Sequence, residues 1–340
     1  MLTLVAVGDV LPHRRVKASA VDLGWDGVLA GVSDRIRAAD LAFANLESPV
    51  APDHHQGVHG EVFDAPATLP PGLAAVGFDV VSMANNHVWD QGPAGMLETR
   101  QRVLDAGMHP VGVGATCAEA EAPVVVEVKG VRVAFVAFAD LLNLAPTGEG
   151  CVFVPGDPCE QDCLPDRDAL YFPIVPERVH TAIRRAREQA DVVVVSAHWQ
   201  TQYHTDPLPP YVPLARGFLA AGADVVLGHH PHVLQPVERV GNGVIAYSLG
   251  NFVSDMGRKY EPSQEPRRGD TRDGLILELE IRVDGDDVQV VPRTHPTWTD
   301  NQDVIRVVEL SAVPGDLRAI REARVREVLA MPEGEPESVR

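Results

Sequence analysis

One pattern constrains the fold of this 340-residue chain more than any other: a short, almost continuous apolar run, followed at once by Asp, Glu, Asn or His. Runs of this length are typical of strands buried on both faces of a sheet. Helical patterns lie between several of them, which favours parallel strands joined by helices. The five runs are 4–7 before Asp9, 39–43 before Asn45 and Glu47, 78–82 before Asn86 and His87, 190–195 before His198, and 223–227 before 228–232.

The polar clusters are expected to meet at one place in the fold. In open α/β sheets, ligands bind beyond the carboxyl ends of the strands, and each cluster lies at such an end. Later segments predict a hairpin that turns at Lys129-Gly130, and further strands that pair antiparallel. Two mixed sheets flanked by helices accommodate all of these elements. The expected helices are 93–106, 176–189, 211–221 and 316–329, and the expected later strands are 124–128, 131–138, 244–249, 274–283 and 288–291.

The side chains at these strand ends suit divalent metal ions such as Mn, Zn, Fe, Ni or Co. His230 and His232 are separated by one proline and can reach two adjacent metals from a turning segment. Asp9 and Glu47 supply anionic oxygens that can bridge metals roughly 3.5 to 4 Å apart. Any one cluster also fits an ordinary turn or a structural histidine. The coincidence of five clusters at five strand ends favours a metal site.

Two further residues are predicted to act beside the metals rather than on them. His87 follows the candidate amide ligand Asn86 and can give or take a proton. Asp90 lies three residues further on and can orient the His87 ring. His198, at the end of the fourth run, is a candidate ligand or a structural histidine.

The composition limits the kinds of molecule that the chain is expected to bind. The net charge of −19 repels nucleic acid and anionic membranes. A small anionic or polyanionic substrate therefore needs local positive charge, which bound metal supplies. No apolar run is long enough to span a membrane, and the amino-terminal segment lacks a signal-peptide pattern, so a cytoplasmic protein is expected. Nothing in the sequence indicates an oligomeric state.

The four cysteines have no zinc-ribbon spacing. Cys151, Cys159 and Cys163 lie close together without a Cys-x-x-Cys pattern, and Cys117 lies apart from them. Free thiols in a loop are expected. A local disulfide or a metal clip is the alternative.

Two loops carry weaker signals. A solvated loop is expected just after Glu47, with a role for its histidines in binding substrate or an extra metal as the alternative. The later loop at 256–273 holds the one basic cluster of the chain, which is expected to be a charged surface, with contacts to an anion as the alternative. The residues concerned are His54, His55 and His59 in the first loop, and Arg258, Lys259, Arg267 and Arg268 in the second.

Taken in order, the motifs are Gly8-Asp9, Asn45-Leu46-Glu47, Asn85-Asn86-His87 with Asp90 and Gly92, His198-Trp199, Gly228 to His232 with Val233, and Tyr247 to Phe252. They resemble the motifs of the CapA family, a branch of the calcineurin-like metallophosphoesterases. The resemblance covers about residues 2–252. It implies a four-layer α/β/β/α sandwich of two mixed sheets, with a dinuclear metal site between the sheets. We expect one domain over residues 1–311, followed by a helix and an acidic tail over residues 312–340.

By position in these motifs, the resemblance assigns a role to each candidate. The assignments are Asp9 and His232 to one metal, Asn86, His198 and His230 to the other, Glu47 between the two, and His87 to protonation of the leaving group or support of the transition state. The chain departs from the wider pattern in three places. Leu11 stands where the superfamily has a histidine, Glu47 replaces the usual bridging aspartate, and Gln200 and Gln202 occupy the places of a glycine and a glutamate.

The implied activity is hydrolysis of a phosphate ester by water activated between two metals. Two alternatives remain open. The chain could be a binding or assembly component in poly-gamma-glutamate capsule synthesis or export, or it could use its metals for hydrolysis or transfer at an amide. Fold alone does not choose among these chemistries.

Overall fold

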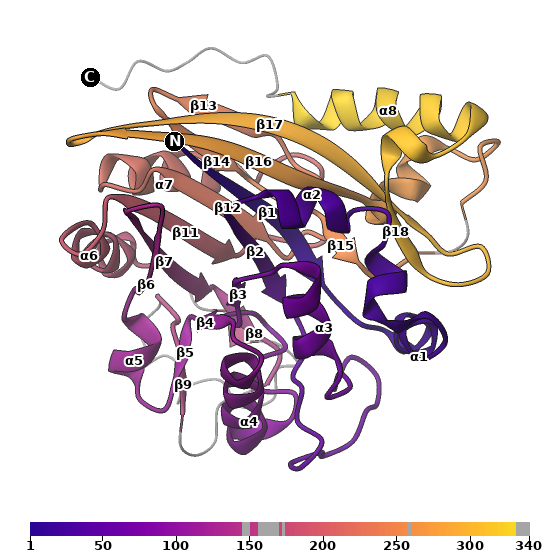
Figure 1. The fold of residues 1–340 in the computed structure, drawn as a ribbon, viewed down its shortest axis with the longest axis horizontal. Helices are drawn as coiled ribbons and strands as arrows, with labels where there is room; N and C mark the ends of the chain where they lie inside the picture. Colours follow the sequence, from indigo (N-terminus) through magenta and orange to yellow (C-terminus); the bar gives the residue numbers. More distant parts are fainter. Residues whose placement is uncertain (145–149, 156–169, 172–173, 258–259, 331–340) are drawn as a thin grey trace.

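The computed structural model describes residues 1–144, 150–155, 170–171, 174–257 and 260–330. Its described part contains two large mixed sheets with helices on their outer faces (Figure 1). The eight-stranded sheet has the order β18-β17-β16-β1-β2-β3-β4, and β15 pairs with β1 beyond Asp9. Its strands are β1 (Leu2–Val10), β2 (Leu41–Leu46), β3 (Val80–Ser82), β4 (His109–Val111), β15 (Asn251–Val253), β16 (Asp273–Asp284), β17 (Asp287–Asp300) and β18 (Arg306–Glu309).

The second sheet has six strands in the order β13-β14-β12-β11-β7-β6. Its strands are β6 (Val124–Val128), β7 (Val131–Ala139), β11 (Val192–His198), β12 (Val225–His229), β13 (Val237–Val240) and β14 (Gly243–Ala246). Two short pairs complete the strands: β5 (Val113–Gly114) with β9 (Cys151–Val152), and β8 (Leu141–Leu142) with β10 (Leu170–Tyr171).

Helices form the outer layers. They are α1 (Arg14–Leu29), α2 (Ser33–Ala38), α3 (Leu69–Val76), α4 (Gly92–Asp105), α5 (Cys117–Glu121), α6 (Pro176–Arg187), α7 (Tyr211–Ala220) and α8 (Gly315–Leu329), with short 3-10 turns η2 (Pro266–Arg272) and η3 (Leu310–Ala312). Among the described residues, none of these helices has the length and apolar character that a bilayer crossing requires.

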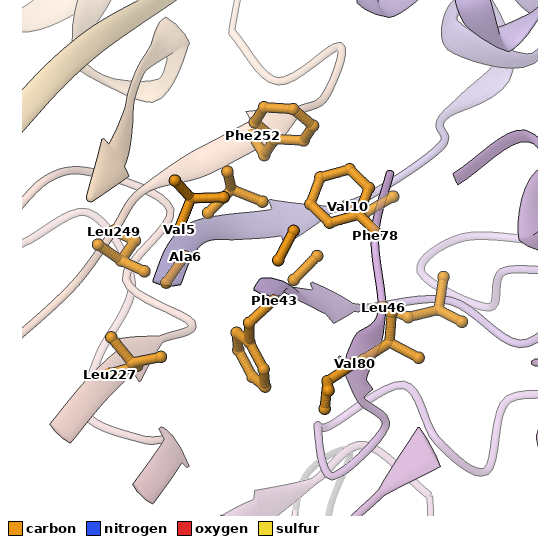
Figure 2. Close-up of a cluster of buried hydrophobic side chains, with 14 of the residues drawn as sticks. Val5, Ala6, Val10, Phe43, Leu46, Phe78, Val80, Leu227, Leu249 and Phe252 are labelled. Carbon is orange, nitrogen blue, oxygen red and sulfur yellow. The ribbon is translucent and has the colours of Figure 1, made fainter. Parts of the chain in front are cut away.

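Alternation along β7 shows why the chain forms layers, because successive side chains of a strand point to opposite faces. Phe135 faces the first sheet and stacks on Phe43 of β2, with ring centroids 5.7 Å apart. Phe138 faces the other way and packs edge-on against Phe218 of α7. Figure 2 shows the first core around β1, with Phe43 and Leu227 on one side of the sheet and Phe252 on the other. The arrangement is the four-layer α/β/β/α sandwich that the family resemblance implies.

All five apolar runs are strands, and the hairpin at Lys129-Gly130 is present as β6 and β7. The expectation that the strand at 244–249 pairs only antiparallel was wrong. Its strand β14 is antiparallel to β13 but parallel to β12. The hairpin with β13 reverses the chain so that β14 returns beside β12, and its buried residues then have sheet neighbours on both edges.

The cysteines differ from the expectation of free thiols. Cys117, at the start of α5, forms a disulfide with Cys151, at the start of β9, with their Cα atoms 4.9 Å apart. The antiparallel β5–β9 pair brings Cys151 opposite Gly114, close to the first turn of α5. Cys159 and Cys163 lie outside the described residues.

Candidate metal centre

The carboxyl ends of β1 and β2 from one sheet face those of β11 and β12 from the other. In the register of the first sheet, Asp9 lies opposite Asn45, whose Nδ2 donates to Asp9 Oδ1 at 2.8 Å. Close backbone approach at these ends requires glycine. A Cβ at Gly8 would lie 1.9 Å from the carbonyl oxygen of Gly250, and one at Gly228 would lie 1.8 Å from that of Tyr247.

Asp9 is fully buried and lies among three histidines. Its Oδ2 is 3.2 Å from His232 Nδ1, and its Oδ1 is 3.4 Å from His229 Nδ1. The backbone N–H of His230 donates to Oδ2 at 3.4 Å. Burial raises the pKa of Asp9, but hydrogen bonds from His229 and His232 outweigh this effect and hold the pKa below its ordinary range. Asp9 is therefore an anionic oxygen donor next to imidazoles.

Glu47 lies between His198 and His232. Its Oε1 is 3.6 Å from His198 Nε2 and 3.8 Å from His232 Nε2. Neither carboxylate oxygen has a hydrogen-bond partner, although the side chain is fully buried. Burial first, and repulsion from Asp9 second, raise the pKa of Glu47 well above its ordinary value. A carboxylate in this position needs a cation or a proton.

His198 and Asn86 face each other at the ends of β11 and β3. His198 Nε2 lies 2.8 Å from Asn86 Oδ1, and the His198 and His230 rings are 4.8 Å apart. Burial lowers the pKa of His198 well below its ordinary value and that of His230 to about 3, and repulsion by neighbouring imidazoles adds to the effect. Both rings are therefore neutral, which is the form that binds metals.

The donor set fits divalent metal ions on a structural observation. Ligand atoms of Glu47, His230 and His232 lie within 4.8 Å of one another, and all three residues are buried. His230 Nδ1 and His232 Nε2 have no hydrogen-bond partner. Buried polar groups without partners are costly, and a shared cation satisfies several of them at once.

The turn that carries His230 and His232 is held in an uncommon conformation. Both residues have positive φ, 94° and 58°, a region that side chains other than glycine rarely adopt. His232 Nδ1 also lies 3.1 Å from Asn251 Oδ1, and Asn251 Nδ2 donates to the His232 carbonyl. In this conformation, ligand atoms of both imidazoles lie within 4.8 Å of a Glu47 carboxylate oxygen.

His87 lies next to this cluster and is oriented by Asp90. The His87 Nδ1 is 2.8 Å from Asp90 Oδ2, which also accepts the backbone N–H of Phe63 at 2.6 Å. The Phe63 ring packs on the His87 ring at 4.5 Å between centroids. Since Nδ1 is engaged, Nε2 is the ring atom left for chemistry.

Sequence reasoning assigned no role to three residues that the structure brings to the centre: Asn45, His229 and Asn251. Both ring nitrogens of His229 lack hydrogen-bond partners, and its place in the Gly228–His232 cluster was the available signal. Burial and repulsion from His232 and His87 lower the pKa of His13 to about 4. His13 comes near the centre, whereas Leu11, at the superfamily's histidine position, is buried as an apolar residue.

The weaker loop signals have structural explanations. His54 and His55 are largely exposed and pair with Glu98 and Asp64 through Nδ1, as expected of a solvated loop. Gln200 is fully buried and its Oε1 accepts the backbone N–H of Leu208, so it shapes the loop after β11. The basic residues Arg267 and Arg268 are exposed, and Arg258 and Lys259 lie outside the described residues.

An α/β/β/α sandwich with buried Asp, Glu, Asn and His side chains at facing strand ends defines a metallophosphoesterase-like class of protein. The family model of the bacterial capsule synthesis protein PGA_cap matches residues 3–256. The chain belongs to this family.

Curated relatives agree with this assignment. The chain is 31% identical over 296 residues to the capsule biosynthesis protein CapA of Bacillus anthracis, covering 86% of this chain and 67% of the relative. It is 30% identical over 291 residues to the PGA biosynthesis protein CapA of Bacillus subtilis, covering 84% and 69%. Among solved structures, the sulfate thiohydrolase SoxB of Thermus thermophilus matches with a TM-score of 0.46 and 14% identity, over 91% of this chain and 48% of that chain.

Proposed function

We propose that the chain is a metal-dependent hydrolase that holds two divalent ions and cleaves a phosphate ester. The observation that carries the proposal is the set of buried donor atoms without partners, on Glu47, His230 and His232, at one meeting point of two sheets. A buried carboxylate with a raised pKa and neutral imidazoles make a poor structural core but a good ligand set.

The distances support a division of ligands into two groups. Asp9 and His232 lie 3.2 Å apart and form the first group. His198 and Asn86, at 2.8 Å, form the second, and His230 stacks beside His198. Glu47 contacts a histidine of each group through the same oxygen, which suits a bridging position.

In the proposed reaction, the metal ions and the protein side chains have different roles. Two such ions, when bound, lower the pKa of a water molecule and neutralise charge on the phosphoryl oxygens. We assign to His87 the protonation of the departing alcohol from Nε2, because Asp90 engages its Nδ1 at 2.8 Å and orients the ring. Phe63 covers the same ring and keeps water from it.

The test is turnover of p-nitrophenyl phosphate and bis(p-nitrophenyl) phosphate by purified protein supplemented with Mn, Zn, Ni or Mg. We expect metal-dependent turnover of one ester, and its loss in Asp9→Ala and His230→Ala variants that retain the fold. His54→Ala is the matched control, since His54 lies in an exposed loop and pairs with Glu98. Undiminished turnover in the Asp9 or His230 variant would contradict the proposal.

A second candidate function is supported by the family. Relatives of this chain carry the names of capsule or PGA biosynthesis proteins, so the same centre could bind or process a glutamate polymer. A fully metal-loaded protein that turns over neither ester favours this role. Cleavage of a γ-glutamyl amide under the same conditions assigns the centre to amide chemistry instead.

A further inference from the structure

A cavity of about 300 Å³ adjoins the candidate metal centre. Tyr203 lines it and also faces the centre, with its ring centroid 6.3 Å from that of His232. Thr271 lines another part of the cavity, and its carbonyl accepts a hydrogen bond from Asn251 Nδ2 at 3.0 Å. Asn251 in turn contacts His232. The cavity and the metal centre therefore share walls.

The loop after β11 that lines the cavity is held in a defined shape. Tyr203 and Gln200 both have positive φ, 66° and 74°, a conformation that persists only where the surroundings impose it. The Tyr203 N–H donates to the Pro231 carbonyl at 2.8 Å, between the two metal-facing histidines. Gln235 donates to the His204 carbonyl at 2.8 Å and accepts from Gln200. Such a loop can present its side chains to a ligand without first becoming ordered.

Several donors around the cavity are free to bind a ligand. The closest carboxylate to the Arg267 guanidinium is that of Glu265, at 3.9 Å, and both side chains are largely exposed. Within the described part of the chain, the Tyr203 hydroxyl and the His204 ring have no hydrogen-bond partner. The Arg267 guanidinium, the Tyr203 hydroxyl and the His204 ring thus line the same cavity.

The charges around the cavity are balanced rather than uniformly basic. Asp270 is neutralised by Arg321 and Arg324, at 2.9 and 2.8 Å. Asp206 also lines the cavity, and in the described residues its carboxylate has no ion-pair partner. The cavity therefore offers one unneutralised anion, Asp206, alongside the cation of Arg267. A pair of opposite charges recognises a zwitterion and discriminates against a ligand that carries only one of the two charges.

We propose that this cavity binds the α-amino-acid head group of the substrate, with Arg267 pairing with its carboxylate and Asp206 with its ammonium group. The inference rests on the proposed function, because it places the remainder of the substrate past Tyr203 at the metal centre. Two kinds of compound carry this head group: the amino-terminal residue of a γ-linked glutamate chain and an O-phosphorylated amino acid.

The test is calorimetric titration of the metal-loaded protein with two probes, γ-L-glutamyl-L-glutamate and O-phospho-L-serine. Each probe is compared with an analogue that lacks the amino group. We expect at least one probe to bind and its analogue to bind about tenfold more weakly, the effect of one lost charged hydrogen bond. Asp206→Asn should weaken the amino ligand by about the same factor and leave the analogue unchanged. Arg267→Ala should weaken binding of both the amino ligand and its analogue. The control Arg268→Ala, at the exposed neighbouring residue, should change neither affinity.

Equal affinity of the wild type and Asp206→Asn for the amino ligand would overturn the inference, as would failure of both probes to bind. The probe that binds identifies the source of the head group. Binding of a probe without ester turnover contradicts the proposed phosphate-ester hydrolysis but agrees with the proposed head-group site. Turnover of p-nitrophenyl phosphate without head-group binding contradicts only the site.

Discussion

Glu47 shows how one buried side chain can dictate the chemistry of a site. Its carboxylate is fully enclosed, has no hydrogen-bond donor, and lies near a second carboxylate, Asp9. Without a cation it is stable only as the neutral acid, because desolvation raises its pKa. Binding of a divalent ion replaces that proton, so the residue links metal affinity to pH.

Asp140 is a second buried acid, at the end of β7 and outside the ligand set. Burial raises its pKa to about 7, although the Tyr211 hydroxyl donates to it at 2.7 Å. In the unfolded chain this carboxyl ionises near pH 4, whereas in the folded chain it stays protonated up to about pH 7. Its contribution to stability is therefore complete below about pH 4 and declines as the pH rises to about 7.

We expect Asp140→Asn to remove that decline, because the amide keeps an acceptor for Tyr211 and has no proton to lose. Urea unfolding of both proteins at pH 5 and pH 8 measures the effect. From pH 5 to pH 8, the free energy of unfolding should fall by a smaller amount in the variant than in the wild type. Asp22→Asn, a change in the exposed part of α1, is the control. The same fall in wild type and Asp140→Asn would contradict the assignment.

His87→Gln should lower kcat by roughly 10²- to 10⁴-fold, the usual contribution of a general acid, while KM and metal content stay near the wild-type values. His87 is not among the expected ligands, and its ring is held by Asp90 rather than by the ligand cluster. Steady-state kinetics with elemental analysis of the same preparations provide the check. His55→Ala, in the exposed loop, is the matched histidine control. Loss of metal in the His87 variant would assign the residue to the ligand set instead.

Helix α8 is joined to the centre through one short segment. Arg321 of α8 is completely buried, packs against the rings of Tyr260 and Trp298, and donates to both Asp270 and Asp273. The carbonyl of Thr271, between those two aspartates, holds Asn251 beside His232. The division of the chain at residue 311 stays a prediction, but the helix that follows it (Figure 1) contributes Val325 and Val328 to the same hydrophobic core as the first sheet.

Arg321→Met should destabilise the protein by about 3 to 5 kcal/mol, because it leaves buried carboxylates without their partner. The control is Arg318→Met on the same helix, where the arginine is half-exposed and pairs with Glu322; a change within about 0.5 kcal/mol is expected there. Chemical denaturation of the metal-free proteins measures both. Similar small losses in the two variants would show that the buried pairs add little.

The disulfide is a second interaction that joins separate elements of the fold, here α5 and β9. Cys117 and Cys151 are 34 residues apart, and a cross-link of that span stabilises a fold by about 2 to 4 kcal/mol by restricting the unfolded chain. A Cys117→Ser/Cys151→Ser variant should lose that amount in urea unfolding. Peptide mapping of the unreduced protein should recover the two cysteines in one linked pair, and recovery of both as free thiols would contradict the structure.

At the scale of the whole molecule, the strands were predictable because each apolar run is buried on both faces and ends in a polar cluster. Asp9 and Glu47 follow adjacent strands of one sheet, so their approach to each other follows from parallel pairing. His198 ends a strand of the other sheet and reaches them only because the two sheets face each other. Asn251 joins the centre only because β15 pairs beside β1, a long-range pairing that no local pattern encodes. The disulfide partner of Cys117 could not be predicted for the same reason, because the pairing depends on the register of β5 and β9.

The direction of β14 was missed for a related reason. An apolar run is compatible with parallel or antiparallel neighbours, and only the β13 hairpin fixes which one forms. Candidate ligands can be proposed from residue types because they depend on single side chains, whereas strand pairing depends on the whole sheet. Membership of the PGA_cap family places this centre in a group of capsule synthesis proteins without stating its reaction.

Metal content tests the central claim, that two facing sheets bring their strand ends together around a dinuclear centre. The measurement is elemental analysis of the protein after loading with Mn or Zn and removal of unbound metal, beside Glu47→Gln, His230→Ala and the control His54→Ala. We predict about two ions per chain for the wild type and the control, and less than one for the two ligand variants. Trace metal in a folded wild-type protein, or full occupancy in both ligand variants, would contradict the account.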